Sequence, residues 1–426
     1  VVAGRIFVGD SQGKVYAIDL DDGSTLWTAD NPGGTLWPGV ATKKLVAFAS
    51  TPGYVTGYDA QTGRSLWRID TGRAITSAPA LADGTIYVAT QGGHVHAIAI
   101  DDGRELWKSP HLGAAVQGGL CVYKGRVYTG TEAAEAVALS AKDGSIVARR
   151  KLTGQGFRRV WPVATGDRVI FTTVPVICVG SEFVNDGVLA GKPGESVGYK
   201  PDIKPGYPNP RAEEDAVRKW LAGAGKYWEV HFALRASDLK KDYIVATGVT
   251  DGCGTPPTPP AIDGDGRPLL WWASAYGTVI RKCGFGTNFT TDISSFDLKT
   301  GRRVLIDNGR YADGQTTETD NLYAMSVGGK RLYLRQNFRG TSCIDLTTSR
   351  HNRISAVYRY RDSGGWMSPI NYANGQIRGN PGSWPKDVVR VPSHPPAAAG
   401  RVAPAIADGK LIFTENFCVT CVETAK

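Results

Sequence analysis

Short apolar runs separated by polar, glycine-containing turns make up most of the first third of the chain. Runs such as Thr85–Val88 and Val95–Ile98 are rich in β-branched and aromatic residues, which predicts β-strands. A strand of this kind, an Asp-Gly or Thr-Gly turn and a strand ending in Trp return together about every 40 residues. Four short strands per unit at this spacing predict the blade of a β-propeller.

The repeat can be followed through the whole chain. Its clearest copies run from Val15 to Trp27, from Val55 to Trp67 and from Val95 to Trp107. Weaker copies cover residues 136–148, 231–243, 294–305, 342–353 and 420 to the end, which brings the number to eight. The sequence therefore predicts an all-β protein: an eight-bladed β-propeller of four-stranded antiparallel blades, with one short inserted helix, in a single domain over residues 1–426.

Two residue types define the turn of each repeat. Asp19 and Asp59 are placed to accept backbone N–H groups within a tight turn. Gly23, Gly63 and Gly103 complete that turn, because glycine adopts positive φ at little steric cost. The pattern predicts the same turn in every blade.

Trp27, Trp67 and Trp107 end the outer strands of the first three copies. A large ring at this place can cover the joint between two blades and donate a hydrogen bond through its N–H group. Because these residues recur with the repeat, we interpret them as structural. Later copies have Ala148, Tyr243, Leu305 and Arg353 instead, which predicts looser outer strands there.

The runs AIDLDDGSTLW, GYDAQTGRSLW and AIAIDDGRELW resemble the tryptophan-docking repeat of pyrroloquinoline-quinone-like (quinoprotein-type) β-propellers. The resemblance covers most of the chain and is strong over residues 1–150. That family includes quinoprotein dehydrogenases and non-catalytic relatives. The resemblance therefore implies a propeller and leaves both an enzyme and a scaffold open.

Four long excursions interrupt the later copies, at residues 176–228, 277–292, 308–322 and 361–400. Strands alternate in direction within a blade, so we expect all four on one face. The first contains a predicted helix from Pro210 to about Ala222, with Asn209 as its cap and Gly223 as its stop. Its apolar stripe, which includes Trp220, is expected to pack on the propeller rim in preference to forming a partner groove.

The charge and the cysteine content bear on the cellular location of the chain and on the kinds of partner it can bind. The net charge of +9 comes from scattered basic residues, which gives no support to nucleic-acid binding. No apolar run is long enough to span a membrane, and the start at Val1 suggests a processed or trimmed chain. We predict an extracytoplasmic location, periplasmic, secreted or cell-surface, and a possible disulfide between Cys253 and Cys283.

Catalytic signals are sparse. Quinoprotein dehydrogenases, as the resemblance implies, need adjacent cysteines, a Trp floor and calcium ligands, and no two cysteines are adjacent in this chain. His94 and His96 share a strand face but lack an identifiable third metal ligand. We therefore assign no catalytic residue, no metal site and no cofactor, and expect pyrroloquinoline quinone and calcium only if the enzyme alternative holds.

The remaining function is binding. Aromatic and basic residues of the kind enriched at interfaces are predicted on the face that carries the excursions: Trp37, Arg73, Arg158, Arg159, Trp161, Arg281, Lys282 and Trp366. We predict a non-catalytic scaffold that binds a protein partner or a neighbouring subunit in an envelope or surface assembly. The alternative is a pyrroloquinoline-quinone- and calcium-dependent dehydrogenase that oxidises alcohols or sugars.

Overall fold

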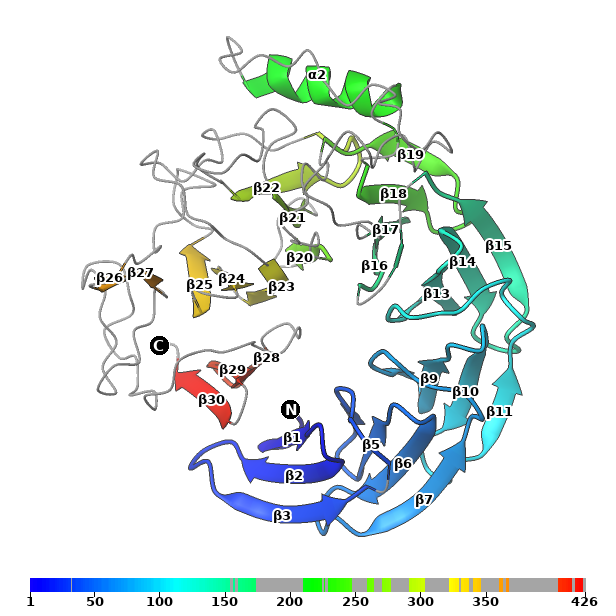
Figure 1. The fold of residues 1–426 in the computed structure, drawn as a ribbon, viewed down its shortest axis with the longest axis vertical. Helices are drawn as coiled ribbons and strands as arrows, with labels where there is room; N and C mark the ends of the chain where they lie inside the picture. The colour runs from blue at the N-terminus through cyan, green and yellow to red at the C-terminus, as the bar shows by residue number, and fades with distance from the viewer. Residues whose placement is uncertain are drawn as a thin grey trace. The chain divides into compact units, whose positions relative to one another are not determined.

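The structure is a computed structural model of the chain (Figure 1). It describes residues 1–173 apart from 32, 154–155 and 158–159, residues 210–246 apart from 224–225 and 227–228, and residues 259–263, 270–276 and 291–302, together with the segments 322–328, 331–336, 340–345, 360–362, 365–367, 405–415 and 418–423. The chain divides into two compact units. Unit 1 holds residues 1–152, 156–171 and 234–240, and unit 2 holds the remainder.

Unit 1 contains four successive antiparallel sheets, each following the chain order from its first strand to its last. The first sheet is β1 (Arg5–Gly9), β2 (Lys14–Asp19) and β3 (Thr25–Asp30); the second is β4 (Val40–Ala41), β5 (Leu45–Ala49), β6 (Tyr54–Asp59) and β7 (Ser65–Asp70). The third is β8 (Ala80–Ala82), β9 (Thr85–Ala89), β10 (Val95–Ala99) and β11 (Glu105–Lys108); the fourth is β12 (Cys121–Tyr123), β13 (Arg126–Thr131), β14 (Glu135–Ser140) and β15 (Ile146–Lys151).

Aliphatic side chains fill the space between successive sheets. The second and third sheets bury Val55 against Val88 and Ile98, and the third and fourth bury Val95 and Val137 in another cluster. Strands buried on both faces explain why the inner runs of the sequence are apolar almost throughout instead of alternating. Each pair of sheets therefore has its own apolar layer.

Aromatic docking joins the sheets at their outer strands. The indole N–H of each repeat tryptophan donates to a backbone carbonyl of the next sheet: Trp27 to Ala60 at 3.1 Å, Trp67 to Ile100 at 2.9 Å and Trp107 to Ala141 at 3.0 Å. The rings lie on the turn glycines of that sheet, Gly63, Gly103 and Gly144, where an added Cβ would come within 2.5–2.6 Å of a ring carbon. Those glycines have φ of +73° or +74°, so the turn needs glycine for two separate reasons.

A different device replaces the tryptophan after β15, where Ala148 stands in its place. Arg126 Nη1 donates to the carbonyls of Ala236 and Ser237, each at 2.6 Å, and the hydroxyl of Tyr128 donates to that of Ala236 at 2.9 Å. The turn position held elsewhere by glycine is Leu239, buried and with φ of +57°. Without a ring above it, this turn has room for a side chain.

The next sheet consists of β16 (Val163–Thr165), β17 (Arg168–Thr172), β18 (His231–Arg235) and β19 (Lys241–Ile244). The residues between β17 and β18 include the predicted excursion, which therefore joins the second and third strands of one sheet. Further sheets of unit 2 are β20 (Ala261–Asp263), β21 (Leu270–Tyr276) and β22 (Thr291–Asp297); β23 (Leu322–Gly328), β24 (Arg331–Gln336) and β25 (Gly340–Asp345); β26 (Tyr360–Asp362) and β27 (Gly365–Met367); and β28 (Ala405–Ala407), β29 (Lys410–Glu415) and β30 (Cys418–Glu423).

Two of the expectations for unit 2 need correction. Tyr243 does not loosen its strand: its hydroxyl donates to the Leu298 carbonyl at 2.9 Å, and its ring lies on Gly301 as the tryptophans lie on their glycines. A phenol supplies both a ring and an O–H donor, so it substitutes for an indole. The segment 361–400 is also not wholly a loop, because β26 and β27 fall at its start.

Helix α2 (Pro210–Ala222) forms over the residues that the capping pattern predicts. Its Trp220 and Leu221 are buried, and Arg218 Nη1 donates to the Gly301 carbonyl at 3.0 Å. Arg302, next to that glycine, forms an ion pair with Asp215 of the helix. The helix therefore packs on the turn at Gly301, within its own unit.

Candidate binding face

Two kinds of segment meet at one end of the unit 1 sheets. The turns at residues 10–13, 50–53, 90–93 and 131–134 alternate there with the connections at 31–39, 71–79 and 109–120, and we call this end the turn face. Backbone N–H groups bond each connection to the turns on both of its sides: Asn31 to Gly13 at 2.7 Å, Thr51 to Thr35 at 2.9 Å, Thr71 to Gly53 at 3.0 Å, Gln91 to Ala74 at 2.8 Å, Leu112 to Gly93 at 2.8 Å and Glu132 to Ala115 at 2.9 Å. Satisfied backbone of this kind makes the turn face a continuous, ordered surface.

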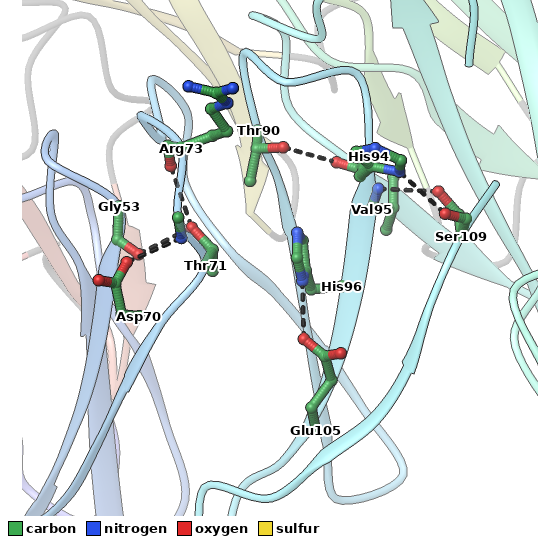
Figure 2. Close-up of polar contacts among 11 residues, drawn as sticks. Gly53, Asp70, Thr71, Arg73, Thr90, His94, Val95, His96, Glu105 and Ser109 are labelled. Atoms are coloured by element: carbon green, nitrogen blue, oxygen red, sulfur yellow. Dashed lines mark hydrogen bonds and ion pairs between the residues drawn. The ribbon is translucent and has the colours of Figure 1, made fainter. Parts of the chain in front are cut away.

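Arg73 is the exposed cation of the second connection. The Thr71 hydroxyl lies 2.8 Å from the Gly53 carbonyl and 3.0 Å from that of Arg73, which fixes the backbone on both sides. The aliphatic part of the Arg73 side chain rests on Gly92 of the next turn, where an added Cβ would lie 2.7 Å from Cγ. Figure 2 shows the guanidinium directed away from Thr71 and Gly53. Arg73 is thus a cation presented on a rigid base, suited to a carboxylate.

The third sheet carries a histidine pair: His94 directly precedes β10 and His96 stands on it (Figure 2). His94 Nδ1 is 2.9 Å from the Ser109 carbonyl, and His96 Nδ1 is 2.8 Å from a carboxylate oxygen of Glu105. His96 is buried, and burial lowers its pKa more than the neighbouring Glu105 raises it. The ring is therefore neutral at pH 7, with the proton on Nδ1 and a buried Nε2 that has no partner among the described residues.

A metal does not fit this histidine cluster. His111 approaches His94 with ring centroids 5.3 Å apart, but its Nδ1 accepts the Gly113 N–H at 3.0 Å, which leaves the proton on Nε2. Among the residues that the structure describes, no group of three His, Cys, Asp or Glu side chains is arranged to hold a metal ion.

The predicted binding-face residues differ in exposure, and some of them lie outside the described part of the chain. Arg73 is exposed, whereas Trp37 is half-buried and donates its indole N–H to the Ile75 carbonyl at 2.8 Å, which is a packing role. Trp161 is half-buried, and Gly119 lies against its Cβ. Trp366 falls on strand β27. The other predicted residues lie outside the described part of the chain: Arg158, Arg159, Arg281 and Lys282.

The cysteine prediction has no structural outcome, because Cys253 and Cys283 also lie outside the described residues. Cys121 is a half-buried free thiol. Burial raises the pKa of the Cys121 thiol to about 11. That thiol is protonated at neutral pH and is a poor nucleophile.

Comparison with known proteins identifies relatives of the repeat in the first half of the chain. A family model described as outer membrane protein assembly factor BamB, built on the pyrroloquinoline-quinone-like repeat, matches residues 11–113 and again residues 91–191. Residues 11–191 therefore carry pyrroloquinoline-quinone-like repeats. The two matches cover the sheets with docked tryptophans, so the family pattern and the docking geometry identify the same part of the chain.

Individual relatives match over shorter stretches. Over 93 residues the chain is 33% identical to outer membrane protein assembly factor BamB of Escherichia coli (strain K12), which covers 19% of this chain and 23% of that protein. BamB of Shigella dysenteriae serotype 1 (strain Sd197) gives the same values. The chain thus matches less than a quarter of the length of these curated relatives.

Solved structures match over more of the chain. The crystal structure of the computationally designed Ika8 protein has a TM-score of 0.50 at 11% identity, over 78% of this chain and 77% of that one. BamB from Moraxella catarrhalis has a TM-score of 0.47 at 14% identity, over the same shares. At such low identity the likeness to Ika8 concerns the fold alone. None of the helices among the described residues is both long and apolar enough to cross a membrane.

The docking partners of the fourth sheet escaped the sequence analysis. Arg126 and Tyr128 stand on an inner strand, more than a hundred positions from the carbonyl that they bind. The signal that could have revealed them is Leu239, which occupies the repeat's glycine position opposite a repeat that lacks its tryptophan.

Proposed function

We propose that this chain is a non-catalytic, extracytoplasmic protein-binding propeller that serves as a scaffold in an envelope assembly. We infer an eight-bladed ring, since eight of the sheets formed by the described residues have three or four strands. The repeat match to an outer membrane protein assembly factor supports the setting, while the activity and partners of that protein are not transferred by a match of this length.

The turn face is the binding surface in this proposal. The observation that carries it is the way Arg73 is held: its backbone is bonded through Thr71, the aliphatic part of its side chain rests on the neighbouring turn, and its charge is exposed. Arginine presented in this manner loses little conformational entropy on binding a carboxylate. The partner surface is accordingly predicted to be acidic.

A charge reversal with an internal control tests the proposal. Arg73 and Arg64 are both exposed and flank the second sheet at opposite ends, since β6 runs from the turn at 50–53 to the turn at 59–64. We expect Arg73→Glu to weaken capture of a partner from an envelope extract by about tenfold or more, and Arg64→Glu to leave it unchanged. Equal effects of the two variants would contradict a turn-face site.

The enzyme alternative has its own test. Addition of pyrroloquinoline quinone and calcium to the purified chain, followed by dye-linked oxidation of an alcohol or a sugar, is expected to give no turnover. Turnover that needs both additions would establish the dehydrogenase and refute the scaffold.

A further inference from the structure

Four of the six exposed large hydrophobic residues in the described part of the chain occupy one repeated position. They are Leu26, Leu66, Leu106 and Val147, each 41–44% exposed, and each comes directly before the docking position on an outer strand of unit 1. We call them the rim row. Exposed aliphatic residues scattered singly need no explanation, but a row in register across four sheets does.

Each member of the rim row is also the bulged residue of its strand. The register between the last two strands of every sheet skips it: Ala17 faces Trp27 while Ile18 faces Thr25, and the same slip recurs at Leu66, Leu106 and Val147. Bulges on edge strands turn side chains outward and interrupt continuous pairing with an added strand. The rim row is thus adapted for side-chain contact and opposes simple strand addition.

A second row runs parallel to the first. Two residues after each rim position stand Thr28, Arg68, Lys108 and Arg149, all exposed. Three of the four are basic, and Lys151 adds a further positive charge on β15. Figure 1 shows β3, β7, β11 and β15 on the outer side of their sheets in unit 1, so the apolar and basic rows follow the same edge. A ligand crossing these strands would meet both rows at once.

We propose that this edge of unit 1 binds an amphipathic segment of a partner protein that carries apolar side chains beside carboxylates. The carboxylates complement the basic row. A second copy of the chain fits poorly, because it would bring the basic row against itself, while the carboxylates of these strands, Asp30, Asp70 and Glu105, lie outside that row. A membrane also fits poorly: more than half of each rim side chain is already covered, and no aromatic residue is among the exposed large hydrophobics of the described residues. The proposal does not depend on the turn face.

The test uses the full chain and a fluorescent synthetic peptide that alternates leucine and glutamate. We expect it to bind, and to bind the Leu66→Ser/Leu106→Ser variant on the order of tenfold more weakly. Ile406→Ser, which removes a side chain of similar size and exposure from β28, is the matched control and is expected to bind as the parent does. Peptides alternating leucine with lysine, or serine with glutamate, are expected to bind weakly.

Other outcomes overturn the proposal. Equal binding of the lysine peptide would show that the basic row does not select carboxylates. An unchanged affinity in the double variant would show that the rim row does not contact the peptide. Binding to vesicles of phosphatidylcholine and phosphatidylglycerol in place of the peptide would identify a lipid surface. A photoreactive copy of the peptide guards against misfolded variants, because on the parent chain it must label β7, β11 or β15; labelling elsewhere refutes the site. Arg73→Glu is expected to leave peptide binding unchanged, which separates this site from the turn face.

Discussion

The glycine beneath each docked ring provides a measurable test of how the sheets are joined. Gly103 and Gly23 have the same backbone conformation, with φ of +74° and +73°. An added Cβ at Gly103 would lie 2.6 Å from the Trp67 ring, whereas one at Gly23 meets no atom within 4 Å. Gly23→Ala therefore measures the backbone cost alone, and Gly103→Ala measures that cost together with displacement of the ring.

The magnitudes follow from these contacts. An alanine at positive φ costs about 1 kcal/mol, so Gly23→Ala should lower the free energy of unfolding by about that amount. Overpacking adds about 2 kcal/mol, which gives about 3 kcal/mol for Gly103→Ala. Trp67→Ala removes a half-buried ring and one hydrogen bond and should cost about 3 kcal/mol. In the double variant no ring is left to displace, so its loss should be about 4 kcal/mol instead of the additive 6 kcal/mol.

Urea denaturation followed by far-UV circular dichroism measures all four variants without relying on tryptophan fluorescence. The native pair of Ala148 with Leu239 indicates that a ring-free joint tolerates a side chain at this turn position. Equal losses for Gly103→Ala and Gly23→Ala, or additive losses in the double variant, would refute the interpretation of the aromatic joint.

Three further predictions concern single side chains. Because the pKa of His96 is lower in the folded chain than in the unfolded one, the free energy of unfolding should fall as the pH drops below about 6.5. His96→Thr installs the residue found at Thr56 of the previous repeat and should flatten that part of a stability–pH profile. An unchanged slope would contradict a neutral, buried His96. Tyr243→Phe should cost about 1 kcal/mol in thermal unfolding through loss of the bond to the Leu298 carbonyl, and no loss would mean that the phenol does not replace an indole. Arg126→Met should cost about 2 kcal/mol, because it removes a charged donor from two carbonyls and leaves only that of Ala236 with a second donor, the Tyr128 hydroxyl. A neutral effect in the same assay would show that water replaces the lost donor.

The repeat could be predicted because its restraints are local. Tryptophan, turn aspartate and turn glycine stand within a few residues of one another, so their spacing carries the geometry of the joint. Helix α2 was equally predictable, since proline at its first position and glycine beyond its end are local signals. The role of Tyr243 does not follow from the repeat pattern, because that pattern is defined by tryptophan, whereas the joint needs only an aromatic ring and a hydrogen-bond donor.

The sequence does not show which of the predicted interface residues are exposed in the folded chain. Trp37 is of a residue type that is common among interface anchors, yet its indole N–H donates to the Ile75 carbonyl and its ring packs on the core. The substitution of Arg126 and Tyr128 for a tryptophan depends on strands far apart in the chain, for which a single sequence gives no spacing rule. The bulges that turn Leu66 and Leu106 outward depend on pairing register, which becomes visible only when both strands are placed.

The scaffold function is tested most directly by site-specific photo-crosslinking of the full chain in its own cells. A photoreactive amino acid at position 73 samples the turn face, and one at position 64 samples the opposite end of the same sheet. The proposed function predicts a discrete crosslinked protein from position 73 and none from position 64. Crosslinks of equal yield from both positions, or none from position 73, would contradict it.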